Sequence, residues 1–343
     1  IYLIFFFSLS VVANNESKLK KLNIPDNFEI SIYADQLNSP RQITETEDGY
    51  IVVGSKNGDK IYALLDQDKD GFAEKKYVIV SGLKNPTGVT YHDGNLYFSE
   101  IEKIWVIKEI DAWLLSNKEN DPKVEIYIDD LPSETWHGFR HIRFGPDDKL
   151  YLPIGVPCNV CIDPQTKDKR FAAIHKYENG KLVMVADGVR NSVGIDWHPD
   201  TQNLYFSDNG RDWLGDNTPS CELNVVTEEG SFYGFPYKHA KNVIDPEFGK
   251  LISGLNVDFV DPIAELGPHV APLGIEFYDG KKFPKQYHNN VFIALHGSWN
   301  KYNGKSGYKV IMVKLDDNGN YISQEDFITG WLENENAWGR PVQ

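Results

Sequence analysis

The sequence predicts an all-β protein, specifically a six-bladed β-propeller whose last blade is incomplete. One phrase recurs along the chain: a small or turn residue, alternating apolar residues, Asp-Gly or a substitute, and then two or three β-forming residues. The copies lie about 40–50 residues apart, a spacing that is typical of propeller blades stretched by insertions. Helical periodicity is nearly absent, apart from one short helix predicted at residues 110–116. A sandwich or a β-helix explains the long regular spacing less well.

The repeats and their insertions locate a channel. The copies occupy residues 39–54, 85–98, 136–155, 191–207 and 271–294, and residues 339–343 begin a sixth. Most copies are followed by a third strand, at residues 60–64, 104–107, 173–177 and 309–313. Two insertions, residues 208–270 and 295–308, leave from the second strand of a unit. Loops between propeller strands gather at the mouth of the central channel, so we expect both insertions to wall a pocket there.

The domain organisation follows from length and composition. With 41% apolar and 13% aromatic residues, residues 25–343 suffice for one propeller. Residues 1–13 are an apolar run too short to span a membrane, and Val11 and Ala13 suit a signal-peptide cleavage rule. We therefore interpret them as the remnant of a secretory signal, with a buried N-terminal strand as the alternative. Residues 14–24 are predicted to be a flexible leader, and the mature protein to be periplasmic or secreted without a membrane span.

The net charge of the chain limits the classes of partner that it is expected to bind. It carries 35 Lys and Arg against 50 Asp and Glu, a net charge of −15. Nucleic acids and anionic membranes need a basic face, so neither is an expected partner. Any anionic ligand must be held by a few locally placed Arg or Lys residues.

The three cysteines predict one local disulfide. Cys158 and Cys161 form a Cys-x-x-Cys motif, but Ile162 follows where haem attachment needs His. A second pair that could complete a tetrahedral zinc site is missing from the sequence. In an exported protein we expect these two cysteines to be oxidised to each other and Cys221 to be free.

Three segments carry polar groups suited to chemistry. His137 stands beside Trp136 just before the first strand of the third copy, and the alternative role for it is to pack on that ring and cap the strand. Arg190 and Asn191 lie at a loop-to-strand junction, where they can bind carboxylates or brace a turn. Residues 208–216 are rich in oxygen ligands, which suits a hard cation or Asx turns.

Other motifs are weak or missing. Residues 66–71 begin like a calcium loop, but Tyr77 stands where an EF-hand needs Glu. A solvated acidic hairpin is the first reading of this loop, and a loose surface Ca²⁺ site is the alternative. The sequence has no Gly-x-Ser-x-Gly elbow, His-Glu-x-x-His motif or phosphate-binding glycine loop.

With these segments placed, the chain resembles the soluble glucose/sorbosone dehydrogenase family, six-bladed propellers that use pyrroloquinoline quinone and Ca²⁺. The resemblance covers nearly everything from about residue 25 to the end. Its most specific motifs are His137 ahead of residues 144–147, and residues 189–191, 207–212, 232–236 and 339–342. Residues 157–161 and 296–300 look more like the sorbosone-type branch than the glucose-oxidising one.

The resemblance implies a role for each matching residue. His137 would take the proton from a sugar hydroxyl while hydride passes to the quinone, and we expect His141, four residues further on, to be structural. Arg190 and Asn191 would lie beside the cofactor, and the backbone carbonyls of Gly210 and Arg211 would bind Ca²⁺. The cofactor is a tricarboxylate, so an acidic protein needs arginines aimed inward to hold it.

The C-terminal motifs add cofactor contacts and contain the departures from the family. Arg340 would meet a cofactor carboxylate, and the Lys of the fifth blade appears here as His296 or is supplied by Lys301. Val156 replaces the acid that often orients the catalytic His, and Trp338 replaces an Arg.

The sequence thus predicts a quinoprotein that oxidises an aldose or aldosone and passes electrons to an external quinone or cytochrome. A Ca²⁺-dependent lactonase-like hydrolase and a non-catalytic carbohydrate-binding propeller are the alternatives. A lactonase needs side-chain carboxylates and Asn around one metal in the channel.

Overall fold

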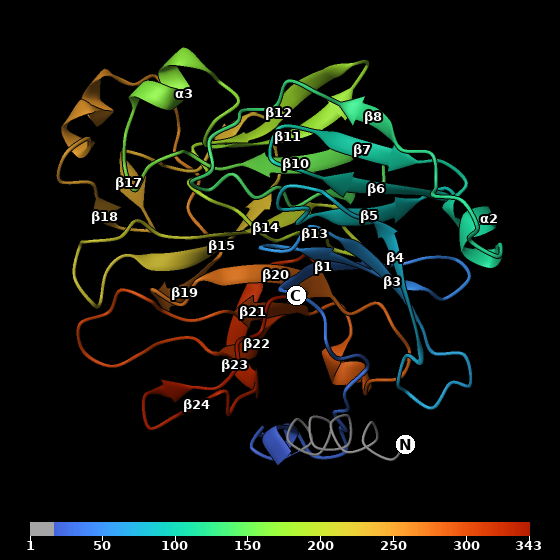
Figure 1. Cartoon of the computed structure of the whole chain (residues 1–343). Coiled ribbons are helices and arrows are strands. Elements are labelled where there is room, and N and C mark those ends of the chain that lie inside the picture. The colour runs from blue at the N-terminus through green and yellow to red at the C-terminus, as the bar shows by residue number, and fades with distance from the viewer. Residues whose placement is uncertain (1–16) are drawn as a thin grey trace.

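The computed structural model describes residues 17–343, whose strands form a ring of five small sheets (Figure 1). The first sheet contains β1 (Pro40–Glu45), β2 (Ile51–Ser55), β3 (Ile61–Leu65) and β4 (Lys75–Val80). The second contains β5 (Val89–His92), β6 (Asn95–Ser99), β7 (Ile104–Ile107) and β8 (Glu125–Ile128). The third contains β9 (Arg143–Phe144), β10 (Leu150–Ile154), β11 (Ala173–Glu178), β12 (Lys181–Asp187) and β16 (Ser231–Phe232).

The other two sheets follow the same antiparallel order. The fourth contains β13 (Ile195–Trp197), β14 (Leu204–Asp208), β15 (Ser220–Val226) and β19 (Ala264–Pro268). The fifth contains β20 (Pro272–Phe277), β21 (Val291–Leu295), β22 (Lys309–Leu315) and β23 (Tyr321–Ile328). Short elements decorate this ring: α2 (Ile110–Leu115), α3 (Asp163–Lys167), the 3₁₀ turns η1 (Gly249–Gly254) and η2 (Lys285–Tyr287), and the hairpins β17 (Lys238–His239) with β18 (Val243–Ile244) and β24 (Leu332–Glu333) with β25 (Asn336–Ala337).

Apolar side chains between neighbouring sheets form the core. One cluster joins the first and second sheets through residues such as Val52 and Phe98, and the next three clusters join the following pairs of sheets in turn. In the second, third and fourth sheets, the second and third strands are largely buried because a neighbouring sheet covers each face. This face-to-face packing of successive sheets is the propeller arrangement.

The fifth and first sheets are bridged by the C-terminal residues. The carbonyl of Val342 accepts a hydrogen bond of 2.8 Å from the backbone N–H of Gly274 in β20. Oε1 of Gln343 accepts one of 3.0 Å from the backbone N–H of Ile43 in β1. Residues 342–343 therefore lie between the first strands of these two sheets.

The prediction of an all-β ring is confirmed, and the described residues form five blades where six were predicted. The third strands and the short helix are also confirmed, as β3, β7, β11, β22 and α2. The predicted signal remnant, residues 1–13, lies outside the described residues. Within the predicted leader, the backbone of Asn23 bridges Thr329 and Lys21 pairs with Glu333 at 2.7 Å. No helix in the described part of the chain is long and apolar enough to cross a membrane.

Candidate active site

A central cavity of about 340 Å³ lies where the first strands of the sheets begin. Residues in the first strands, or in the loops just before them, contribute to its wall from all five sheets: Arg41, Thr87, His141, Val193 and Leu273. The structure brings three of the sequence-predicted site residues to this wall, namely His137, Asn191 and His296. It does not place Arg190, Gly210, Arg211, Lys301 or Arg340 on the wall.

The ring of His137 is held in one tautomer. Nδ1 lies 2.7 Å from the backbone carbonyl oxygen of Val156. Because a carbonyl can only accept, Nδ1 must carry the proton. Nε2 therefore has a lone pair, which accepts a 3.1 Å hydrogen bond from the indole N–H of Trp136. The site thus holds a neutral imidazole whose basic nitrogen is met by a half-exposed indole.

The backbone of Val156 orients His137. Val156 stands where the resembling family often has an acid that orients the histidine, and its side chain cannot do so. Its backbone carbonyl performs the same orienting contact without a charge. Sequence comparison of side chains alone could not have revealed this contact.

Two backbone features let His137 approach the loop after β10. His137 has φ of 53°, a left-handed conformation that non-glycine residues seldom adopt. Gly155 faces it, and a Cβ on Gly155 would lie 2.7 Å from His137 Cβ and 3.0 Å from Asn191 Oδ1. A glycine at position 155 is therefore needed for His137 and Asn191 to share the wall.

Electrostatics keep His137 neutral. Burial, together with the positive charge of Arg190, lowers the pKa of His137 from 6.5 to about 3. The imidazole is therefore unprotonated at neutral pH and free to accept a proton. A base of such low pKa is weak until negative charge enters the cavity.

Asn191 reaches the wall because Asp208 holds its backbone. Asp208, at the end of β14, accepts hydrogen bonds from the backbone N–H groups of Arg190 at 2.8 Å and Asn191 at 2.7 Å. Burial raises the pKa of Asp208 to about 6. This acid therefore shapes the loop ahead of β13 and leaves the amide of Asn191 at the cavity.

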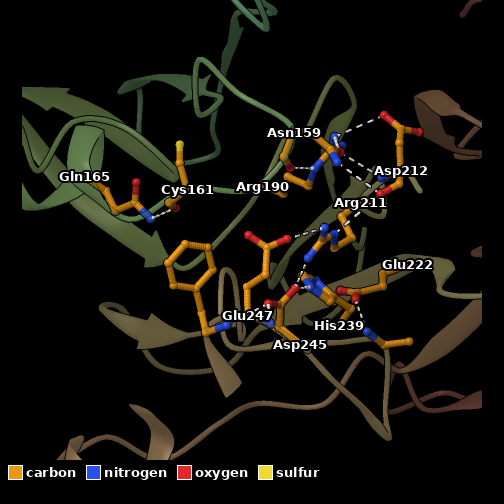
Figure 2. Close-up of polar contacts among 12 residues, drawn as sticks. Asn159, Cys161, Gln165, Arg190, Arg211, Asp212, Glu222, His239, Asp245 and Glu247 are labelled. Atoms are coloured by element: carbon orange, nitrogen blue, oxygen red, sulfur yellow. Dashed lines mark hydrogen bonds and ion pairs between the residues drawn. The ribbon is translucent and has the colours of Figure 1, made fainter. Parts of the chain in front are cut away.

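The side chains of Arg190 and Arg211 are turned into the protein (Figure 2). The guanidinium of Arg190 donates to both the carbonyl and the side-chain oxygen of Asn159, at 2.8 and 3.0 Å, and to the carbonyl of Asn209 at 3.0 Å. Arg211 pairs with Asp245 and, at 3.1 Å, with Glu247. Their donors are used in bracing loops, so in this structure neither guanidinium meets a ligand in the cavity.

Arg340 and Gly210 also lie off the cavity wall. Arg340 donates to the carbonyl of Gly297 at 3.2 Å and to the hydroxyl of Tyr308 at 3.0 Å, with its guanidinium stacked on the Tyr308 ring. Gly210 packs against Ser220 rather than the cavity. The predicted calcium carbonyls are therefore not part of this wall.

The long insertion has a structural role that was not predicted. Residues 208–270 supply β15 and β19, which complete the fourth sheet, and β16, which pairs in parallel with β12 of the third. Its residues do not contribute to the cavity wall, whereas the shorter insertion does, through His296. The predicted disulfide between Cys158 and Cys161 is confirmed, and Cys221 is free and buried.

Sequence comparison assigns the family. The chain matches the family described as "Domain of unknown function (DUF7133)" over residues 14–342. It belongs to this family. It is also 38% identical over 347 residues to an uncharacterized protein of Borreliella burgdorferi, an alignment that covers 98% of this chain and 88% of that protein.

Solved structures share the fold. The family AA12 carbohydrate-active enzyme of Trichoderma reesei, in its iodide structure, has a TM-score of 0.76 and 19% identity, covering 92% of this chain and 90% of that one. The holo form of the pyranose dehydrogenase PQQ domain of Coprinopsis cinerea has a TM-score of 0.74 and 17% identity, covering 94% and 89%. The PQQ-bound aldose sugar dehydrogenase of Streptomyces coelicolor has a TM-score of 0.62 and 20% identity, covering 93% and 86%. At these identities the likeness shows a common fold.

Two cations of the wall were missed by sequence reasoning. Arg41 of β1 and Lys56, just after β2, both line the cavity, and Lys56 lies 4.7 Å from the centre of the Phe139 ring. Burial lowers the pKa of both, and the charge of Arg41 lowers the pKa of Lys56 further. Within residues 17–343 neither forms an ion pair, and the wall has no Asp or Glu. Arg41 follows Pro40 as Leu273 follows Pro272, so an alignment of the repeats could have placed Arg41 on the wall.

His141 also lies on the wall, although it was predicted to be structural. Its side chain is buried, and its Nε2 has no hydrogen-bond partner in the part of the chain that the structure describes. Burial lowers the pKa of His141 to about 3, so it too is neutral at physiological pH. With His137 and His296, the cavity therefore offers three neutral imidazoles beside two cations.

Proposed function

We propose that this protein is an oxidoreductase that oxidises a sugar by hydride transfer to bound pyrroloquinoline quinone, with His137 as general base. The observation that carries the proposal is the cavity wall, where a tautomerically fixed imidazole lies among unpaired cations. The names of the structural neighbours point to the same chemistry, since they include a pyranose dehydrogenase PQQ domain and a PQQ-bound aldose sugar dehydrogenase.

His137 acts through Nε2 in this proposal. The Nδ1–H donated to Val156 keeps the Nε2 lone pair directed at the cavity. When a sugar hydroxyl replaces the indole of Trp136 on Nε2, its proton can pass to the imidazole as the hydride leaves carbon. A positioned base of this kind contributes about 10²–10⁴-fold in rate.

The cationic wall fits a polycarboxylate cofactor. Arg41 and Lys56 are unpaired within the described residues and half-buried, so a carboxylate between them would gain charge-assisted hydrogen bonds. His296 would donate through Nε2 only when protonated, because its Nδ1 already donates to the carbonyl of Pro341 at 2.8 Å. The quinone, when bound, would supply the hydride acceptor. These cations replace Arg190 and Arg340 as the groups that hold the cofactor.

Calcium fits less well. The proposed carbonyl ligands, Gly210 and Arg211, lie off the wall, so no step here depends on the metal. The lactonase alternative needs carboxylates around a metal in the channel, and the described wall has none. The proposal also keeps four expectations from the sequence. They are the sorbosone-type branch, a sixth blade between β20 and β1, a periplasmic or secreted location, and a quinone or cytochrome as electron acceptor.

The test separates binding from turnover. The quinone is titrated into His137→Ala and His141→Ala by tryptophan fluorescence, and oxidation of an aldose and aldosone panel is followed with an artificial electron acceptor. We expect His137→Ala to bind the quinone normally and lose about 10²–10⁴-fold in turnover. His141→Ala should lower the melting temperature more than the rate. Turnover that survives in His137→Ala would refute the proposed base.

The cations are tested by affinity. Arg41→Gln and Lys56→Met should each weaken quinone binding by about tenfold or more, since each removes a charged hydrogen bond. Lys84→Met is the matched control, because Lys84 is an exposed lysine away from the wall. Equal loss of affinity in all three variants would mean that only the overall charge matters.

A further inference from the structure

Two loops carry aromatic rings that are exposed together and that do not line the cavity. Trp213 lies between β14 and β15, and Trp299 lies between β21 and β22. They are 67% and 70% exposed, and their ring centroids are 5.9 Å apart with an edge-to-face angle of 88°. Tyr302, on the second loop, is 95% exposed. Single exposed aromatic residues are common, but a cluster of them marks an interaction site.

The two loops are fixed to each other by polar contacts. The side-chain amide of Asn300 donates to Asp212 Oδ1 at 2.6 Å. The carboxylate of Asp216 accepts the backbone N–H groups of Tyr302 and Asn303 at 2.7 and 2.8 Å. His269 also contacts the carbonyl of residue 215 at 2.8 Å. The rings are thus presented by a cross-linked pair of loops, which reduces the entropy that a ligand must restrict.

The loop between β14 and β15 holds Trp213 in a strained backbone conformation. Trp213 has φ of 70°, a conformation that is unfavourable for a bulky side chain. The preceding residue, Asp212, is anchored by a 2.8 Å bond from its backbone N–H to Asn159 Oδ1 and lies 3.4 Å from the guanidinium of Arg190. The surrounding contacts therefore hold an exposed indole in a strained position, which is a pattern of binding sites.

The aromatic pair lies beside the cavity. Trp299 is three residues after His296 of the wall, so their Cα atoms are at most about 11 Å apart. On the other loop, Asp212 contacts Arg190, which is adjacent to Asn191 of the wall. A chain-like ligand whose end occupies the cavity can therefore reach both rings.

We propose that Trp213 and Trp299 form a binding platform for further sugar units of an oligosaccharide whose terminal unit enters the cavity. Indole faces suit the apolar faces of pyranose rings, while nearby amides and carboxylates suit their hydroxyls. The acidic side chains of the loops and the net charge of −15 favour a neutral ligand over an anionic one. This inference rests on the proposed function and specifies its substrate class.

Binding is measured on the whole chain without cofactor, so the result does not depend on turnover. Calorimetry follows gluco-, xylo- and galacto-oligosaccharides from monosaccharide to hexasaccharide. For at least one series we expect affinity to rise about tenfold or more with length. Trp213→Ala and Trp299→Ala should remove that gain, and Tyr321→Ala, an exposed aromatic on β23, should keep it. Melting temperatures of the variants confirm that they fold.

The outcomes separate this inference from the proposed function. If no series shows a gain with length, the platform is refuted even when the parent oxidises monosaccharides. If length-dependent binding is lost in the tryptophan variants but no sugar is oxidised, the platform stands and the oxidoreductase proposal fails. If the variants keep sugar affinity and lose reduction of a cytochrome acceptor, the rings contact an electron acceptor, and the platform is refuted.

Discussion

Replacing Trp136 by Phe should raise the pKa of His137. The indole N–H donates to His137 Nε2 at 3.1 Å, and this hydrogen bond exists only while Nε2 is unprotonated. A hydrogen bond to the neutral form lowers the pKa of an imidazole, so its removal shifts the pKa upward. Phe keeps an aromatic ring over the site, and Trp136 is 55% exposed, so the fold should tolerate the change.

The size of the shift follows from the strength of one hydrogen bond. A net contribution of about 0.5–1.5 kcal/mol corresponds to about 0.4–1.1 pH units, at 1.36 kcal/mol per unit. Water can reach the half-exposed site and donate to Nε2 in the variant. This replacement limits the expected rise to the lower half of that range, about 0.4–0.7 pH units.

The assay is NMR of histidine labelled at Cε1, with the His137 resonance identified by its loss in His137→Gln. The spectra are followed from neutral pH downward while the native pattern persists. Protonation should begin at a higher pH in Trp136→Phe than in the parent. Trp299→Phe is the control, because its ring contacts Trp213 and not a histidine. An unchanged or lower onset in Trp136→Phe would refute the tautomer and the contact on which the proposed base depends.

Two further predictions concern the buried charges behind the site. Arg211→Met leaves Asp245 buried without its cation and should lower the free energy of unfolding in urea by about 3–5 kcal/mol. Lys167→Met breaks an ion pair in solvent and should change that free energy by under about 0.5 kcal/mol. Equal unfolding midpoints for the two variants would contradict this prediction. Burial raises the pKa of Glu222 from 4.5 to about 8, so its ionisation increasingly destabilises the fold as the pH rises through that window. The stability of Glu222→Gln relative to the parent should therefore increase from pH 4.5 to 8 in thermal melts, and a flat difference would show that Glu222 is ionised throughout.

The ring of sheets could be predicted because every repeat carries its own evidence. Residues 89–98 alternate β-formers around an Asp-Gly turn, and they fold as β5 and β6. The same pattern recurs in four other sheets, so one misjudged strand would not change the fold class. The partners of the long insertion could not be predicted, because β19 pairs with β15 across a separation that contains β16 to β18.

Part of the site could also be predicted, because three of its residues lie in loops next to inner strands. His137 and Asn191 precede the first strands of the third and fourth sheets, and His296 directly follows β21, the second strand of the fifth; these three loops converge on the channel. The direction in which a long side chain points could not be predicted from the sequence. Arg190 sits in the right loop, yet Asn159 and Asn209 take its donors, and those contacts join segments far apart in sequence. Residue type and position therefore predict which loop reaches the channel, but not which guanidinium points into it.

The charges of the wall connect ligand binding to the chemistry of the histidines. Burial, together with the charges of Arg41, Arg340 and Lys56, lowers the pKa of His296 to about 4. A carboxylate bound between Arg41 and Lys56 cancels this repulsion and so raises the pKa of His296. Linkage is reciprocal, so protonation of His296 must strengthen carboxylate binding by the same factor. Negative charge in the cavity likewise favours the imidazolium of His137, so the ligand that the cations attract also makes this imidazole a stronger base.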